Sequence, residues 1–169
     1  MMTISRLTHG LSCLMAAIAL PLAASVMANE ISGTLDGEPQ EWHVLSEGDM
    51  STANFSELMP GMVNVTVQGH REERYETQGT LSINFMVMQG APSEASVTYF
   101  HESGLTPHYG TEEEVPIEIE ELEIDGENGR VKGRVATSLA YVESMMTEHD
   151  HNNVMEIDVT FDVVLAREE

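Results

Sequence analysis

The chain has 169 residues, of which 7 are Lys or Arg and 29 are Asp or Glu, so its formal net charge at pH 7 is −22. Its length fits one ordinary domain. The charge argues against nucleic acid as a partner, because phosphate binding needs clustered Lys and Arg, and it disfavours anionic lipid surfaces for the same reason.

The first 28 residues have the order of a secretory signal peptide. Arg6 lies in a short n-region, an apolar stretch follows over residues 11–27, and Val26-Met27-Ala28 has the small-residue pattern of a cleavage site. An uncleaved membrane anchor is the alternative, but the stretch is short for a bilayer and contains Pro21. We therefore expect a signal peptide over residues 1–28 and a single periplasmic or secreted domain over residues 29–169. No later apolar run is long enough to span a bilayer, so no integral membrane segment is expected after cleavage.

The chain has one cysteine, Cys13, and it lies inside the expected signal peptide. A mature chain without a thiol has no disulfide, no thiolate catalysis and no Cys-ligated zinc. Its stability then has to come from a packed core.

From residue 29 onward the dominant pattern is an alternation of apolar and polar residues, which predicts strands with one buried face. The pattern is clearest over residues 62–68, 80–88 and 154–165. Shorter strands are predicted over 31–35, 41–45, 52–57 and 95–101, with Trp42 in the core and its indole N–H in need of a partner. About 8–9 strands predict an all-β fold, an antiparallel β-sandwich, with a closed calycin-like β-barrel as the alternative.

Residues 115–142 are predicted to form a hairpin around Asn128-Gly129, the pair preferred in a type I′ turn. This turn would place three opposite-charge pairs on one face: Glu127–Arg130, Asp125–Lys132 and Glu123–Arg134. The apolar positions change parity along the first strand, so a bulge is expected near Glu120-Glu121, which would bring Ile119 opposite Thr137. Residues 139–146 have apolar residues at helical spacing, so a short helix is expected there.

Histidines are the strongest candidates for metal ligands, because neutral imidazole suits Zn, Cu or Ni. His149, Asp150 and His151 form one loop, and His101 and His108 bracket a second loop that could complete a His/carboxylate site. The alternative, which the sequence favours, is a solvated polar loop without a metal. Apart from this divalent metal, no cofactor is expected.

Met86 and Met88 alternate with Phe85 along their strand, so they face away from it. This placement suggests residues that line a ligand cavity or an interface. The alternative, again favoured, is a central strand that is covered on both sides.

No catalytic motif occurs in the sequence: G-x-S-x-G, H-E-x-x-H and Gly-rich phosphate loops are all missing. A glycosidase-like carboxylate pair stays open as a minority alternative, because the chain has so many acids. The sequence therefore predicts a protein that is not an enzyme and has no catalytic residues.

Residues 32–38, Glu41-Trp42, 65–70 and 79–83 resemble the strand layout of small exported all-β proteins of marine and halophilic proteobacteria. The resemblance implies export and a β-fold, and it carries no activity or site residues across. Together with the excess of acids, it suggests a protein adapted to salt.

These observations lead to three hypotheses of function. The first is an exported, acidic, non-enzymatic binding or structural accessory domain of the cell envelope, whose partner is an envelope protein or a small ligand. The second is a β-barrel carrier of a small amphiphile, and the third is a metal-binding protein that uses the His/carboxylate loops.

Overall fold

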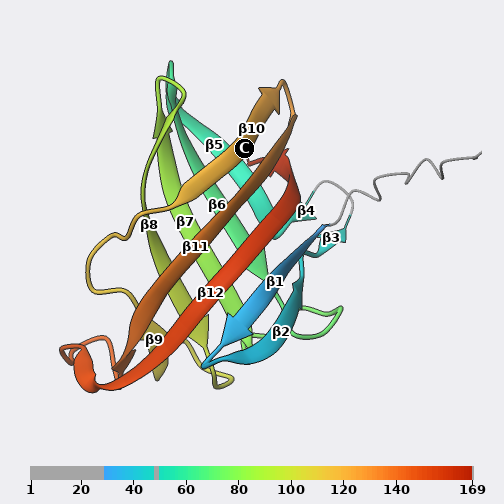
Figure 1. Cartoon of the computed structure of the whole chain (residues 1–169). Helices are drawn as coiled ribbons and strands as arrows, with labels where there is room; N and C mark the ends of the chain where they lie inside the picture. Colours follow the sequence, from blue (N-terminus) through green and yellow to red (C-terminus); the bar gives the residue numbers. More distant parts are fainter. Residues whose placement is uncertain (1–28, 48–49, 169) are drawn as a thin grey trace, which may run out of the picture.

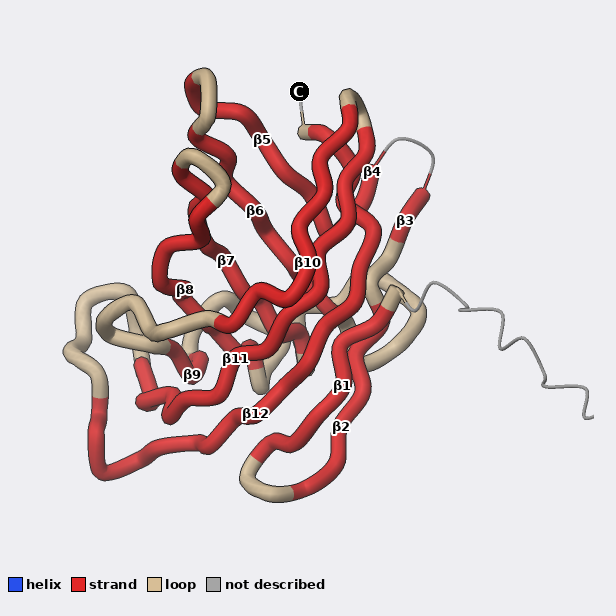
Figure 2. The backbone as a smooth tube through the Cα atoms, turned by 45° about the horizontal axis from the view of Figure 1, so that its top comes forward, coloured by secondary structure: helices blue, strands red, loops and turns tan. Residues whose placement is uncertain are grey.

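The computed structural model describes residues 29–47 and 50–168, and these residues form an all-β domain (Figure 1). The expected signal peptide, with Cys13, lies outside the described residues. No helix is found in the described part of the chain, and so none that could cross a membrane (Figure 2). The strands are β1 (Glu30–Leu35), β2 (Glu38–His43), β3 (Ser46–Glu47), β4 (Met50–Ser51), β5 (Ala53–Met59), β6 (Met62–Gly69), β7 (Thr80–Met88), β8 (Ala91–Phe100), β9 (His108–Gly110), β10 (Glu118–Asp125), β11 (Asn128–Val142) and β12 (Asp150–Arg167).

Ten of these strands form one mixed sheet in the order β10-β11-β9-β8-β7-β6-β5-β12-β1-β2, and β3 and β4 form a separate pair. β11 also pairs with β12, which brings distant parts of the sheet together and curls it into a partial ring (Figures 1 and 2). The ring includes a parallel contact between β12 and β5, at Ala166 and Arg167. The expected two-sheet sandwich is thus not confirmed, because the ten strands belong to one hydrogen-bonded sheet.

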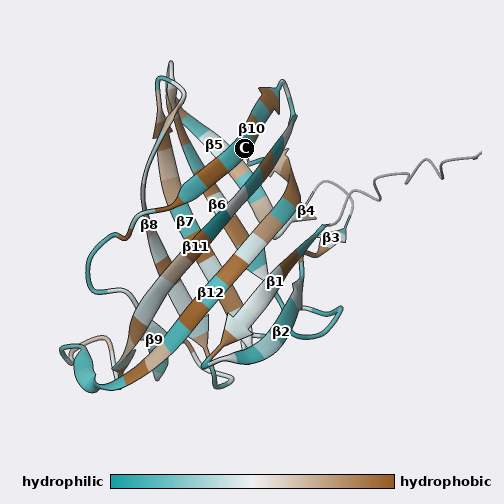
Figure 3. Ribbon diagram, viewed as in Figure 1, coloured by the Kyte–Doolittle hydropathy of each residue, from teal (hydrophilic) through white to brown (hydrophobic). Residues whose placement is uncertain are grey.

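The inner face of the sheet carries the core, as the alternating pattern predicts. Figure 3 shows the alternation along β11 and β12 as bands of hydrophobic and hydrophilic colour. The core side chains come from strands around the whole ring and form one cluster, whose largest members with under 2% exposure include Trp42, Phe55, Phe161, Ile31, Leu81, Ile83, Leu139 and Leu165. The interior is therefore filled by side chains.

β1 and β2 pack against the ring through Trp42, which is fully buried as expected. Its Nε1 donates to the carbonyl oxygen of Gly79 at 2.9 Å, so the indole N–H is satisfied. Gly69 leaves room for it, since a Cβ there would lie 2.6 Å from Trp42 Cβ. Backbone hydrogen bonds between His43 and His70 then join the end of β2 to the end of β6.

The β10–β11 hairpin forms as predicted, but its turn is at Gly126-Glu127 and the predicted turn at Asn128-Gly129 is wrong. Gly126 has a φ of +63°, which suits a glycine. Asn128 and Gly129 instead begin β11 and pair with Ala166 and Leu165 of β12. The pairing with β12 explains the position of the turn, because a turn at residues 128–129 would lose the Asn128–Ala166 and Gly129–Leu165 pairs of the ladder.

The predicted bulge is confirmed, since the register shifts between Ile119 and Glu121. Its partners differ from the prediction: Ile119 lies opposite Gly133 and not opposite Thr137. Because the slip of the turn is two residues, the polar and apolar faces stay as predicted.

The short helix expected over residues 139–146 does not form. Leu139 and Val142 belong to β11 and are buried, whereas Met145 and Met146 are exposed in the following turn. The apolar spacing at 139–142 reflects a strand that continues to the edge of the core, followed by methionines that do not pack.

Candidate functional site

Three aromatic rings meet at the end of the partial ring where β8 and β11 finish and β12 begins, which we call the β9 end. His101 follows β8, Tyr109 is in β9 and Tyr141 is in β11. The ring centroids are 5.1 Å apart for His101–Tyr109, 5.4 Å for Tyr109–Tyr141 and 5.9 Å for His101–Tyr141, with edge or tilted geometries. We refer to these half-buried residues as the Tyr/His cluster.

The strand register explains why the two tyrosines meet. Tyr109 lies directly opposite Tyr99 of β8 and Tyr141 of β11, and opposed residues project from the same face of a sheet. Tyr99 is buried in the core, so the Tyr/His cluster continues the core face to its rim. Nδ1 of His101 is buried with no hydrogen-bond partner, and its Nε2 is 3.7 Å from Glu102 Oε1.

Carboxylates surround this cluster. Burial raises the pKa of the Tyr141 phenol, and the nearby charges of Glu143 and Glu102 raise it further. The phenol therefore stays neutral beside two anions. Residues 101–115 and 141–153 carry four and three acids, respectively, and no Lys or Arg. The β9 end thus combines ring faces with uncompensated negative charge.

The two loops expected to form a metal site meet only in part. Nε2 of His151 lies 2.9 Å from Glu112 Oε2, and Tyr109 Oη donates to Asn153 Oδ1 at 3.1 Å. Asp150 Oδ1 instead accepts a local hydrogen bond from the Asn152 N–H at 2.9 Å.

The remaining histidines of the predicted metal site do not converge. His149 is half-buried ahead of β12, while His108 is next to Tyr109 but packs on Phe100, with its Nδ1 2.9 Å from the Leu105 carbonyl oxygen. No group of three His, Cys, Asp or Glu side chains able to hold a metal occurs among residues 29–47 and 50–168. Of the predicted ligands, the structure thus brings a histidine to a carboxylate across the two loops only at His151 and Glu112.

Met86 and Met88 lie on the outer face of β7, as the alternation predicts, because Phe85 and Val87 are in the core. They stand opposite Asn64 and Met62 of β6. Met86 is half-buried and Met88 is 51% exposed, so this end of β7 is not covered on both sides. Both are separated from the packed interior, where an enclosed ligand would have to sit.

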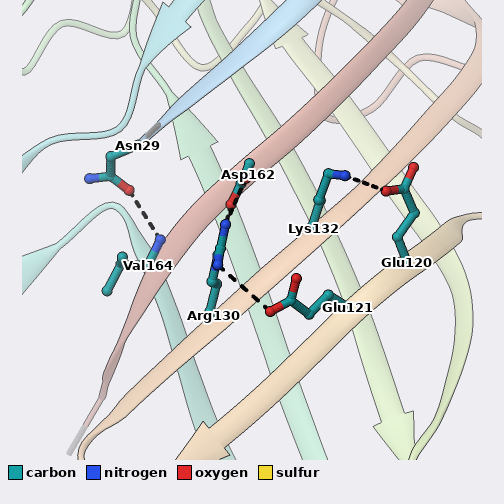
Figure 4. A network of polar contacts seen from close by, with 7 residues as sticks. All are labelled: Asn29, Glu120, Glu121, Arg130, Lys132, Asp162 and Val164. Atoms are coloured by element: carbon teal, nitrogen blue, oxygen red, sulfur yellow. Dashed lines mark hydrogen bonds and ion pairs between the residues drawn. The ribbon is translucent and has the colours of Figure 1, made fainter. Parts of the chain in front are cut away.

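The cations of β11 are held by carboxylates on its outer face, and Figure 4 shows two of them, Arg130 and Lys132. Arg130 makes a bidentate contact with Asp162, at 3.0 and 2.9 Å, and Lys132 Nζ lies 2.6 Å from Glu120 Oε2. Arg134 makes a bidentate contact with Asp158, at 2.8 and 2.7 Å. These hydrogen bonds raise the pKa of all three cations. The three cations are structural, as predicted, but their partners are not the predicted ones.

Sequence reasoning missed a second feature, a cavity of about 260 Å³ on the outer face of β6 and β7. Its wall includes His70, Thr80 and Phe100, together with Tyr75 of the loop between β6 and β7. His70 is only 5% exposed and its Nε2 has no hydrogen-bond partner. The histidine follows a valine-rich strand, which gave no local signal that a loop would fold over it.

Comparison with protein-family models, with curated proteins and with solved structures found no match for this chain.

Proposed function

We propose that this chain is an exported, acidic, non-enzymatic binding domain of the cell envelope, and that it recognises a cationic segment of an envelope protein at the β9 end. The Tyr/His cluster, with its surrounding carboxylates, is the observation that carries this proposal. A Lys or Arg side chain placed over a tyrosine ring gains about 0.5–1 kcal/mol at an exposed site, and more when it loses water.

Charge supports the choice of a cationic partner. With 29 acids against 7 basic residues, the domain attracts cations over its whole surface. The rings add what charge alone does not provide, because they favour a flat guanidinium or an ammonium group at one position. Long-range attraction would then set the rate of encounter, and the Tyr/His cluster would set the place of binding.

The finer architecture and the location belong to the same proposal. The continuous strand order and the added β11–β12 pairing favour the ring-like alternative, a calycin-like barrel, over a sandwich. The composition of residues 1–28 supports export to the periplasm or beyond. The filled interior makes the carrier of a small amphiphile a weaker alternative, and the β9 end brings together only one His–carboxylate pair for a metal.

The test uses the peptide Gly-Arg-Arg-Gly and its citrulline counterpart, which keeps the shape and loses the charge. NMR titration at physiological salt should show that the arginine peptide shifts the ring signals of Tyr109, Tyr141 and His101. The double substitution Tyr109→Leu/Tyr141→Leu should weaken binding about five-fold, because two cation–π contacts of about 0.5 kcal/mol each are lost.

The matched control is Glu118→Gln/Glu123→Gln, which removes two acids from the exposed part of β10 and leaves the rings in place. It should weaken binding far less than Glu102→Gln/Glu143→Gln, although both variants lose the same charge. Equal binding of the citrulline peptide, or equal effects of the two acid pairs, would show that the attraction is diffuse and would contradict the proposal.

A further inference from the structure

The cavity beside His70 is built by a row of three side chains across β6, β7 and β8. Gly69 pairs with Leu81, so His70 and Thr80 follow opposite each other, and Thr80 pairs with Phe100. Leu81 and Tyr99 point into the core, so the row is on the outer face. The loop after His70 covers the row and contributes Tyr75 and Glu76 to the wall of the cavity.

The hydrogen bonds of His70 fix its tautomer. Nδ1 lies 3.0 Å from the carbonyl oxygen of Glu76 and 3.1 Å from Thr80 Oγ1, and the Thr80 hydroxyl itself donates to that carbonyl. A carbonyl oxygen only accepts, and the Thr80 proton is already used, so Nδ1 carries the imidazole proton. In the neutral ring Nε2 is then an acceptor with a free lone pair.

This lone pair is buried without a donor, although buried polar atoms are paired in the large majority of cases. The ring is also held in place by its Nδ1–H bond to a backbone carbonyl, so the lone pair has a fixed direction. His70 lines the cavity but Nε2 itself is buried, so a ligand with one O–H donor reaches this oriented acceptor only when a neighbouring side chain moves.

We propose that this cavity binds a small neutral hydroxylated ring, of the phenol class, whose O–H donates to Nε2 of His70. A volume of about 260 Å³ is enough for a single ring and too small for most drug-sized ligands. Phe100 and Leu105 supply aromatic and apolar wall against which the ring packs.

Other ligand classes fit this cavity less well. Glu76 lines it and pairs with Arg74 at 2.8 Å, and the loop over residues 71–76 has three acids against two arginines. This small negative excess, together with the lone pair of Nε2, disfavours an anionic ring. A metal would lack ligands, because no group of three His, Cys, Asp or Glu side chains gathers there in the described part of the chain.

Tyr75 controls access to Nε2. The Tyr75 ring packs edge-on against the His70 ring, with ring centroids 5.7 Å apart, and Tyr75 itself is 53% exposed. Residues 71–76 are all exposed, so few buried contacts resist a movement of this loop. The ligand ring takes the place of the Tyr75 ring against the imidazole.

The test is a titration of the full chain with phenol in the millimolar range, followed by long-range proton–nitrogen NMR of the histidine rings. Before addition, His70 should show a protonated Nδ1 and an unprotonated Nε2. Phenol should shift the Nε2 signal of His70 and leave the ring signals of His43 and His151 unchanged. The substitution Tyr75→Ala should bind phenol about five-fold more tightly, because the ligand no longer has to displace a ring.

The substitution His70→Gln should remove the phenol-induced shift of the Phe100 ring, and His43→Gln, the same change in the residue paired with His70, should keep it. If His70→Gln fails to fold, the Tyr75→Ala comparison still decides. An unprotonated Nδ1, equal binding of toluene or benzoate, zinc binding at His70, or no His70 shift with phenol would each overturn the proposal. The cavity is on the outer face, so its test is independent of the arginine-peptide test at the β9 end.

Discussion

Asp158 of β12 is the carboxylate whose environment changes most clearly on folding. Its bidentate contact with Arg134 lowers its pKa, and the hydrogen bonds are the main cause. Both side chains are nearly half exposed, so solvent and salt screen the pair and its contribution to stability is modest. The pair still fixes the outer face of β11 against β12, where Arg130 and Asp162 repeat the same geometry.

We expect the substitution Asp158→Asn to alter how stability depends on acid pH. Because the folded carboxyl has the lower pKa, its contribution is fully present above the unfolded value of about 4 and is lost as the pH falls through the folded value. Urea unfolding from pH 7 to pH 3 should show a midpoint difference of a few tenths molar at neutral pH, which disappears in acid. Asp150→Asn loses the same charge without an arginine partner, and an equal pH dependence in both variants would contradict the assignment.

At the scale of elements, β11 is the strand on which the ring depends, since it pairs with β10, β9 and β12. The bulge in β10 lets it follow β11, and Gly133 makes the close approach possible. A Cβ at Gly133 would lie 2.5 Å from the Glu118 carbonyl oxygen and 2.7 Å from Phe161 Cζ. The backbone oxygen cannot move without disturbing the ladder.

The substitution Gly133→Ala is therefore expected to destabilise the domain by about 1–3 kcal/mol through overpacking. Gly110→Ala is the matched control in β9, because its Cβ would meet His108 at 3.4 Å, an ordinary contact, and its cost should stay within about 0.5 kcal/mol. Chemical unfolding of both variants measures the difference. Equal stability of the two variants would mean that β10 moves freely away from β11.

At the scale of the whole molecule, local patterns in the sequence predicted strands better than their arrangement. β7 was predicted at its observed bounds, because one buried face imposes alternation residue by residue. The sequence favoured a sandwich and offered ring closure only as the alternative, since the closure depends on a short parallel contact at Ala166 and Arg167 and on the long ladder between β11 and β12. The hairpin turn was placed wrongly for the same reason: β12, distant from the turn in sequence, decides the register.

At the candidate site, too, the sequence indicated individual residues but not which of them the fold brings together. The sequence indicated His101 and His151 as candidate ligands of one metal site. The structure instead places His101 beside two tyrosines and His151 beside Glu112. Tyr109 and Tyr141 meet only because β9 pairs with β11. No local motif carries information of this kind.

The large negative net charge of the chain, −22 at pH 7, should make its stability depend on salt. Most of the acids have no cation to pair with, because only 7 Lys and Arg face 29 Asp and Glu, and the ion pairs on β11 already use three of those cations. Their mutual repulsion opposes the folded state. Screening shortens its range from about 10 Å at 0.1 M salt to about 3 Å at 1 M.

We therefore expect the melting temperature to rise by about 3–7 °C between 0.1 and 1 M sodium chloride, which corresponds to about 1–2 kcal/mol for a domain of this size. A variant with four exposed acids replaced, Glu38→Gln, Glu113→Gln, Glu114→Gln and Glu148→Gln, should melt higher at low salt and gain less from added salt. Sucrose stabilises folded proteins without screening charge, so it should raise the melting temperatures of both proteins equally. This control distinguishes charge screening from the general stabilising effect of an excluded cosolute. A melting temperature that is independent of salt would mean that the acids do not repel one another in the folded state, and the hypothesis of a salt-adapted protein would fail with it.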